Sequence, residues 1–229
     1  MDYGLRDKTI VITGAFGVLG RAVAELASAQ GARVAMLDVK IAPQSITEPA
    51  LSLAVDLADA AAAARAMSAV RAQTGAIDAL LNIAGGFAYE SFADAGAIET
   101  WERMFALNLR TALVATKAAL PHLIDAKGAI VNVGAAGAVK PGAGMGAYAA
   151  SKQGVMKLTE SLAEELKGRV RVNAVLPSIL DTERNRAEMP SADPSTWVQP
   201  AELAQAMLFL ASDDASAITG ALVPVTGRV

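Results

Sequence analysis

The stretch Thr13-Gly-Ala-Phe-Gly-Val-Leu-Gly20 decides the fold of this chain. It follows the apolar residues 9–12, which are typical of a buried strand, and it leads into a helical pattern over residues 21–27. Glycines in such a turn let the backbone approach a ligand closely, and the start of a helix offers unpaired N–H groups with a partial positive charge. The stretch therefore predicts a strand, a phosphate-binding turn and a helix in succession.

A second predicted strand, over residues 33–38, ends in Asp38. An acid at this place accepts hydrogen bonds from the adenosine ribose and repels a 2′-phosphate. No Lys or Arg lies within residues 14–20 to offset it, although Lys40 follows closely. The whole unit predicts a dinucleotide site that favours NAD(H), with NADP(H) as the alternative. An ordinary strand-to-helix turn is the structural alternative.

The rest of the chain continues to alternate strands with helices. The further predicted strands cover residues 51–56, 77–85, 128–133, 170–176 and 221–225. The predicted helices cover residues 58–75, 98–126, 147–167 and 199–212, and loops cover residues 39–48, 87–96, 134–146 and 177–197. This pattern predicts one doubly wound, Rossmann-type α/β domain over residues 1–229, with a mostly parallel seven-stranded sheet, helices on both faces and a substrate lid at about 177–197.

Composition narrows the choice of partners. The chain has 229 residues, 53% of them hydrophobic, a net charge of −3 and no basic cluster, so we expect neither nucleic acid nor a membrane as a partner. It has no cysteine and one histidine, His122, so we expect no metal site. No leader-like or bilayer-length apolar run is present, and a soluble cytoplasmic protein is the simplest expectation.

Tyr148 and Lys152 stand at the start of the helix predicted over residues 147–167. Their i, i+4 spacing places both side chains on one helix face. A tyrosine hydroxyl has a pKa of about 10, and a neighbouring ammonium lowers that pKa because it stabilises the phenolate. The pair therefore predicts a general acid or base near the cofactor. An exposed Tyr and Lys on an amphipathic helix is the alternative interpretation.

These residues together resemble the short-chain dehydrogenase/reductase family over essentially the whole chain. The matching segments are residues 13–20, Asp56, the Asn-Ile-Ala-Gly run at 82–85, Asn108, Tyr148 with Lys152, and residues 177–182. The resemblance implies an NAD(P)-dependent oxidoreductase in which Tyr148, Lys152 and Asn108 are catalytic. Asn108 would hold a water of the proton relay, and Lys152 would also bind the nicotinamide ribose. The resemblance further implies that the cofactor is bound by Gly14, Phe16, Gly17, Leu19, Gly20, Asp38, Asp56, Leu57, Asn82, Ala84, Gly85, Tyr148, Lys152, Pro177, Ile179 and Thr182.

The sequence departs from the pattern of this family at two positions. Val18 occupies the place of the second glycine in most members, although Gly17 can supply the flexibility one residue earlier. Ala135 occupies the place of the catalytic serine, and nothing in residues 133–137 replaces the hydroxyl. The usual Ser–Tyr–Lys site is therefore incomplete.

The dihydropteridine reductases are similar to this chain at both departures, and the match is most specific over residues 176–193 and at Trp197. This resemblance implies hydride transfer between NAD(H) and a quinonoid dihydropterin, a reactive substrate that needs less oxyanion stabilisation than a ketone. A ketone, alcohol or acyl-thioester substrate is the alternative within the class. A non-catalytic dinucleotide sensor is the alternative from another class, and the retained Tyr148 and Lys152 argue against it.

A few other residues suggest contacts outside the central site. We expect three aromatic residues to line a small-molecule pocket, namely Phe87, Tyr89 and Trp197. Arg184 and Arg186 are available to an anionic substrate, or are ordinary solvated charges of a loop. The family resemblance also implies a homodimer or homotetramer built on the two long helices around residues 98–126 and 147–167.

Overall fold

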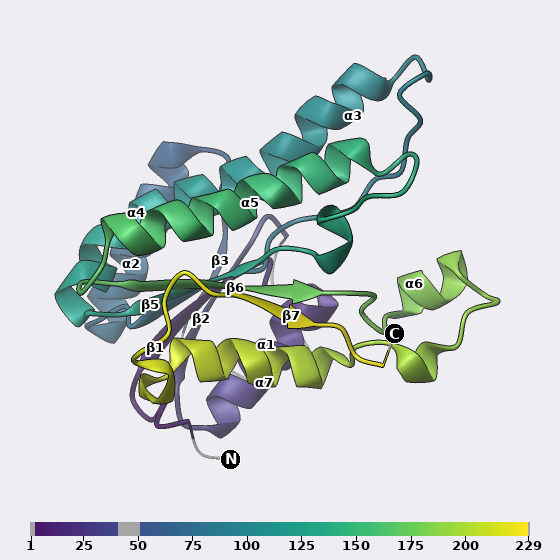
Figure 1. Ribbon diagram of the computed structural model, residues 1–229. Helices are drawn as coiled ribbons and strands as arrows, with labels where there is room; N and C mark the ends of the chain where they lie inside the picture. Colours follow the sequence, from purple (N-terminus) through teal and green to yellow (C-terminus); the bar gives the residue numbers. More distant parts are fainter. Residues whose placement is uncertain (1–2, 41–50, 229) are drawn as a thin grey trace.

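A seven-stranded parallel sheet forms the centre of the molecule in a computed structural model that describes residues 3–40 and 51–228 (Figure 1). The strand order is β3-β2-β1-β4-β5-β6-β7. The strands are β1 (Thr9–Thr13), β2 (Arg33–Asp38), β3 (Leu51–Ala54), β4 (Ala79–Asn82), β5 (Ala129–Val133), β6 (Arg171–Pro177) and β7 (Leu222–Val225). This confirms the predicted doubly wound α/β class. The loop predicted over residues 39–48 lies mainly outside the described residues.

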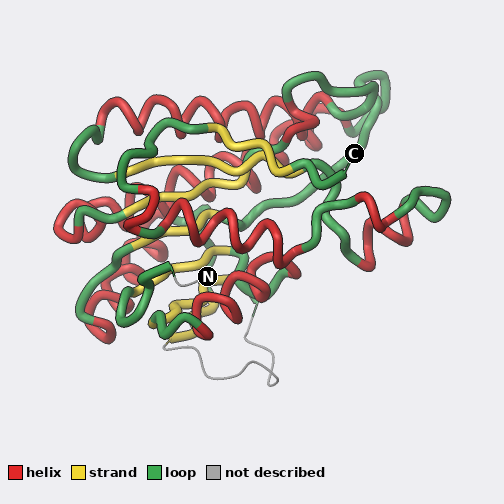
Figure 2. Tube along the Cα trace, turned by 60° about the horizontal axis from the view of Figure 1, so that its bottom comes forward, coloured by secondary structure: helices red, strands yellow, loops and turns green. Residues whose placement is uncertain are grey.

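Helices cover both faces of the sheet (Figures 1 and 2). The α-helices are α1 (Val18–Ala29), α2 (Ala60–Thr74), α3 (Ala97–Met104), α4 (Thr111–Ala126), α5 (Gly146–Glu165), α6 (Glu183–Glu188) and α7 (Pro200–Ala211). Helices α1 and α7 pack together on one face, and α2, α4 and α5 cover the other. Within the described part of the chain, no helix combines the length and apolarity needed to cross a membrane.

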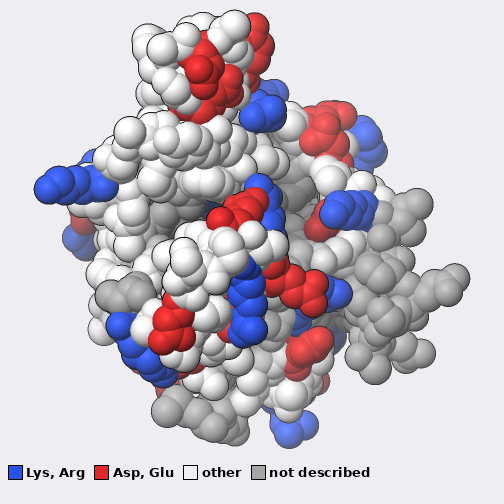
Figure 3. Space-filling model, turned by 90° about the vertical axis from the view of Figure 1, so that its right-hand side faces the viewer, with Lys and Arg blue, Asp and Glu red and all other residues white. Residues whose placement is uncertain are grey.

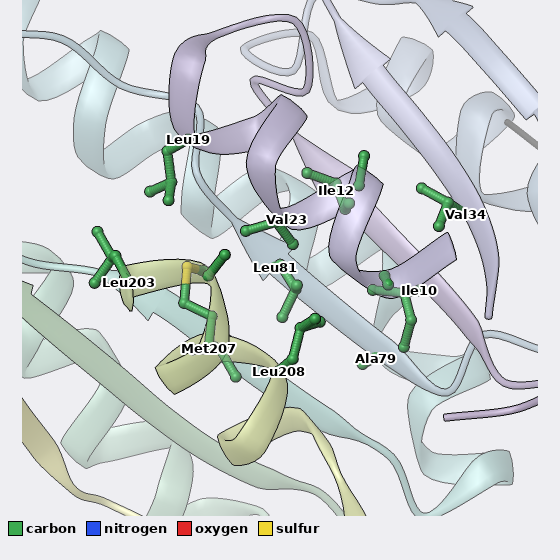
Figure 4. Close-up of a cluster of buried hydrophobic side chains, with 14 of the residues drawn as sticks. Ile10, Ile12, Leu19, Val23, Val34, Ala79, Leu81, Leu203, Met207 and Leu208 are labelled. Atoms are coloured by element: carbon green, nitrogen blue, oxygen red, sulfur yellow. The ribbon is translucent and has the colours of Figure 1, made fainter. Parts of the chain in front are cut away.

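The two faces divide the apolar residues of each central strand between them. Ile10 and Ile12 of β1 point into the core under α1 and α7, whereas Val11 points into the core under α2 and α4. Figure 4 shows the first of these cores, in which Val23 of α1 and Leu208 of α7 meet the strand residues. Because both faces of a parallel sheet are buried, its strands are continuously apolar, and all five residues of β1 are buried.

The chain reverses its direction of sheet growth beside β1. From β1 it builds outward through β2 to β3, and it then returns to place β4 on the other side of β1. The carboxyl ends of β1 and β4 stand next to each other, with Thr13 paired in register with Asn82. A crevice forms at such a switch point, and ligands of open α/β sheets bind there.

The prediction of one long helix over residues 98–126 is wrong in one respect. The structure divides it into α3, a π-helical segment η1 (Phe105–Arg110), and α4. Single π-helical turns inside α-helices are frequent at functional sites. The only buried side chain of η1 is that of Asn108.

The segment over residues 177–197, which we call the lid, is more ordered than a simple loop. It contains helix α6 and a 3-10 turn, η3 (Pro194–Thr196). Thr182 caps α6 by accepting a hydrogen bond from the Asn185 N–H, and the lid is tied back where Leu180 pairs with Val198. These connections hold α6 away from the sheet, beside the carboxyl ends of the strands (Figure 1).

Candidate active site

The glycine turn after β1 is fastened to the loop after β4. Gly14 has a φ of +63°, and a Cβ added to it would lie 2.7 Å from the Ala84 Cα. Thr13 makes the fastening, because its Oγ1 accepts hydrogen bonds from the N–H groups of Ile83 (3.0 Å) and Ala84 (3.1 Å). Thr13 was part of the sequence motif, but the sequence did not indicate this role. Only glycine at position 14 allows the two backbones to approach this closely.

Helix α1 begins at this turn with its first N–H groups uncapped by any side chain. Gly17 is the N-cap residue, and it presents no side chain to the space in front of the helix. Val18, at the position where a second glycine was expected, is 41% exposed and lines that space. Gly20 lies against Gly14 and Ala15, so the helix packs tightly on the turn. The turn therefore keeps the features that bind a phosphate group.

A cavity of about 1200 Å³, which we call the main cavity, opens in front of α1. The glycine turn, the ends of β2 and β4, and the lid all contribute residues to its lining. Figure 3 views this side of the molecule and shows basic and acidic side chains interspersed around the hollow. The sequence-predicted cofactor residues that line the cavity are Gly14, Gly17, Leu19, Gly20, Asp38, Leu57, Ala84, Gly85 and Thr182.

The remaining predicted cofactor residues lie elsewhere. Phe16 is buried in the core under α1, and Asp56 is exposed and accepts a hydrogen bond from the Ala58 N–H. Asn82 is buried and donates to Thr116 Oγ1 (3.0 Å) and Asn132 Oδ1 (2.9 Å), so its amide stabilises the packing of the sheet against α4. The residues outside the lining of the main cavity are Phe16, Asp56, Asn82, Tyr148, Lys152, Pro177 and Ile179.

Asp38 reaches the main cavity at the end of β2. Its Oδ2 accepts a hydrogen bond from the Phe16 N–H (3.0 Å), and its Oδ1 accepts one from the Lys40 N–H (3.1 Å). These bonds fix the carboxylate beside the glycine turn. Among the described residues, four basic side chains line the cavity, those of Arg21, Lys40, Arg184 and Arg186, and Arg21 was not singled out by the sequence.

Tyr148 and Lys152 lie on α5, outside the lining of the main cavity. Lys152 is 6% exposed and its Nζ donates to the Val133 carbonyl oxygen (2.8 Å), so it is held against the end of β5. Burial lowers the pKa of Lys152 to about 8, which leaves the amine charged at neutral pH. The ring of Phe87 contacts that of Tyr148 edge to face, with 4.9 Å between ring centroids.

The expected lowering of the Tyr148 pKa is wrong for this structure. Burial raises the pKa of Tyr148 to about 12, because the phenolate is less well solvated than the neutral phenol. Lys152 Nζ donates to the Val133 carbonyl oxygen and, within the described structure, makes no hydrogen bond to the Tyr148 hydroxyl that would lower this pKa directly. The tyrosine therefore keeps its proton at neutral pH, which suits a proton donor.

Gly85 joins the main cavity to the Tyr148–Lys152 pair. A Cβ added to Gly85 would lie 2.6 Å from Asn108 Oδ1 and 3.3 Å from Lys152 Nζ, so both polar atoms crowd this glycine. Asn108 Oδ1 accepts from the Gly86 N–H (2.8 Å), and its Nδ2 donates to the Gly86 carbonyl (3.1 Å) and to Ser151 Oγ (2.9 Å). The asparagine thus holds the loop after β4 against α5.

Ala135 lies beside Tyr148 in a small apolar cluster with Ala138 and Ala149. It is buried, and its methyl group stands where a serine would present a hydroxyl. Ser151, a nearby hydroxyl, donates to the Tyr148 carbonyl (2.7 Å) within the helix and so does not replace it. The environment of Tyr148 in the described structure is therefore apolar on this side.

The three aromatic residues expected in the pocket wall behave differently from one another. Phe87 does contact Tyr148, and the ring of Tyr89 lies over Gly144. Trp197 is only 1% exposed, so the expectation that it lines a pocket wall is wrong.

The sequence matches the family described as short chain dehydrogenase over residues 8–192. This chain belongs to the short-chain dehydrogenase family. The residues of the main cavity fit the nicotinamide dinucleotide of such enzymes, because a side-chain-free N-cap, an uncapped helix start and a strand-end acid face one space. The dehydrogenase is an NAD(P)-dependent oxidoreductase.

Relatives and solved structures agree along nearly the full length of the chain. The meso-2,3-butanediol dehydrogenase of Serratia marcescens is 34% identical over 237 residues, covering 96% of this chain and 94% of its own. The D-threitol dehydrogenase of Mycolicibacterium smegmatis is 33% identical, covering 99% and 94%. The ligand-free aldohexose dehydrogenase of Thermoplasma acidophilum superposes with a TM-score of 0.90 at 29% identity, covering 100% and 96%. These relatives are dehydrogenases of small molecules.

A solved neighbour also contains a nicotinamide cofactor. The 3-ketoacyl-(acyl-carrier-protein) reductase of Brucella melitensis, determined in complex with NADH, is similar to this chain with a TM-score of 0.84 and 28% identity. The two chains are covered to 97% and 98%. The likeness supports a nicotinamide cofactor for the dehydrogenase described here.

Proposed function

We propose that this dehydrogenase uses NAD(H) to reduce a small substrate whose reacting bond is already polarised, with a quinonoid dihydropterin as the preferred substrate. The observation that carries the proposal is Ala135, a buried methyl group where a hydroxyl would stabilise a developing oxyanion. A substrate that develops little negative charge on oxygen does not need that hydroxyl. The resemblance of residues 176–193 to dihydropteridine reductases supports the same substrate class.

The residues of this chain would divide the work between binding and proton transfer. The bound nicotinamide would supply the hydride. Tyr148 would donate the proton, because its pKa of about 12 keeps it protonated at neutral pH. Lys152 would stabilise the phenolate left behind, since its amine is charged at that pH. Asn108 would position the loop at Gly86 against the catalytic helix.

A second candidate function is the interconversion of a small alcohol and its ketone. It is favoured by the relatives, which are named as dehydrogenases of butanediol and threitol. In that case a water or a substrate hydroxyl would take the place of the missing serine. The two candidates use the same cofactor site. They differ in whether a polar group must occupy the space beside Ala135.

The deciding experiment is NADH oxidation by the purified protein, measured with a quinonoid dihydropterin and with a panel of small ketones that includes acetoin. We expect rapid NADH oxidation with the dihydropterin and none with the ketones. Turnover of ketones alone would establish the second function. Tight NADH binding with no turnover of either class would contradict both and favour a sensor.

Replacing Ala135 with serine should raise the activity toward ketones. The new hydroxyl would stand beside Tyr148, and we expect kcat/KM for ketones to increase roughly tenfold or more, because one oxyanion donor is worth at least that much. Ala136→Ser is the matched control, since Ala136 packs against the neighbouring cluster of Met156 and Leu176 instead. Equal gains in the two variants would contradict the role given to position 135.

Replacing Asp38 with asparagine should weaken the preference for NAD(H). Asparagine retains an acceptor for the Phe16 N–H but removes the negative charge that repels a 2′-phosphate. We expect the ratio of the Kd values for NADPH and NADH to fall roughly tenfold. Glu25→Gln, on the same helix as Arg21 but outside the cavity lining, is the control for charge. An unchanged ratio would remove Asp38 from cofactor selection.

We also propose that residues 1–229 act as one domain that assembles into a homodimer or homotetramer. Exposed apolar side chains, Ile98, Phe105 and Leu113, lie along α3, η1 and α4 on one side of the molecule. The mass measured by light scattering after gel filtration tests this assembly, and a monomer at micromolar concentration would contradict it.

A further inference from the structure

An arginine and an aspartate of the lid form an ion pair on the wall of the main cavity. Arg186 Nε donates to Asp181 Oδ1 (2.7 Å), and Arg186 Nη2 donates to Asp181 Oδ2 (2.8 Å). Gln199 Nε2 also donates to Oδ2 (3.0 Å). Two parallel hydrogen bonds of this kind fix the plane of a guanidinium as well as its position. The pair therefore orients Arg186 more firmly than an ordinary surface charge.

The two members of the pair differ in exposure. The Asp181 side chain is only 8% exposed, and hydrogen bonds to Arg186 hold the pKa of its carboxyl down at about 2, so it stays ionised. The Arg186 side chain is 58% exposed. Its Nη1 group makes no hydrogen bond to any side chain or backbone group in the part of the chain that the structure describes. One edge of the guanidinium is thus held by the lid, and the other edge is available.

The available edge belongs to a residue that lines the same cavity as the glycine turn. Arg186 and Asp181 line the same cavity as Gly17, Val18 and Leu19 at the uncapped start of α1. Arg184, the other arginine of α6, forms an ion pair with Glu188 (2.7 Å). Glu188 is outside the cavity lining. A guanidinium edge matches the oxygens of a phosphate as well as those of a carboxylate.

We propose that Arg186 binds the diphosphate of the dinucleotide with its Nη1 edge while Asp181 holds its other edge, so that the lid covers the cofactor. The proposal rests on the placement of NAD(H) in the main cavity. Arg186 would be a binding residue, and Asp181 would be the positioning residue that presents it. The diphosphate would then be held from one side by α1 and from the other by the lid.

The test compares wild-type protein with Arg186→Gln, using ADP-ribose and adenosine as probes that compete with NADH for the site. ADP-ribose carries the diphosphate and adenosine does not. We expect the Kd for ADP-ribose to rise roughly tenfold in the variant, because a charged hydrogen bond is lost. The Kd for adenosine should stay unchanged. Arg169→Gln removes an exposed arginine of the chain outside the cavity lining and should alter neither value.

The outcomes separate this inference from the placement of the cofactor. An equal loss of affinity for both probes would mean that Arg186 only supports the lid, and no loss for either would mean that it does not reach the ligand. Either result overturns the inference and leaves the cofactor site intact. Failure of the wild-type protein to bind NADH and ADP-ribose would overturn the proposed site itself. Asp181→Asn, which keeps one of the two acceptors for Arg186, should raise the Kd for ADP-ribose by less than Arg186→Gln does.

Discussion

Tyr148→Phe should lower kcat for NADH-dependent reduction roughly a hundredfold or more, because general acid catalysis contributes about that much. The substitution removes only the hydroxyl. The edge-to-face contact of the ring with Phe87 stays in place, and so does the Lys152–Val133 hydrogen bond. Cofactor affinity should therefore change little, and the loss should fall on kcat.

Steady-state kinetics and NADH fluorescence titration separate the two effects. Tyr3→Phe is the matched control, because Tyr3 is a buried core residue far along the chain from α5 and outside the cavity lining. It should leave kcat unchanged. A Tyr148→Phe variant that keeps wild-type turnover would place the proton donor elsewhere.

Gly14→Ala should lower the free energy of unfolding by about 3 kcal/mol, since it combines left-handed backbone strain with a steric collision. The φ of Gly14 is +63°, and the new methyl group would lie 2.7 Å from the Ala84 Cα and 2.8 Å from its nitrogen. Both atoms belong to backbone, which cannot rotate aside as a side chain does. The loops after β1 and β4 would have to separate, so NADH affinity should fall as well.

Gly75→Ala isolates the strain from the collision. Gly75 has a φ of +83° at the end of α2, and nothing lies within 4 Å of an added Cβ. We expect this variant to lose only about 1 kcal/mol of stability and to bind NADH normally. Urea unfolding followed by the fluorescence of Trp101 and of the buried Trp197 measures both. Equal losses in the two variants would show that the approach of Ala84 is unimportant.

The sequence was sufficient for the fold because its signals are local. Continuous apolar runs such as residues 9–12 indicate strands buried on both faces, and the glycine turn and Asp38 mark the first βαβ unit. The spacing of Tyr148 and Lys152 likewise placed both residues on α5. These features depend on residues within a few turns of one another.

Other features depend on contacts between distant parts of the chain, so the sequence did not reveal them. The raised pKa of Tyr148 comes from burial, and Lys152 is engaged by a carbonyl of β5, neither of which the i, i+4 spacing contains. The hydrogen bonds from Asn82 Nδ2 to Thr116 and Asn132 join residues far apart in the chain, so the motif around Asn82 did not reveal them. Trp197 was assigned to a pocket wall for its residue type and lies in the core.

The π-helical segment between α3 and α4 has a consequence for insertion and deletion in this chain. A π-turn contains one residue more than the α-turn it replaces, so the faces of α3 and α4 are out of phase with each other. Helix α3 packs against α5, and α4 packs against α2, so each half satisfies its own partner. Removing one residue from Phe105–Arg110 would restore a regular helix but rotate one half by about 100° relative to the other. A change of length in this segment would therefore displace either Asn108 from the site or one of the two helices from its partner.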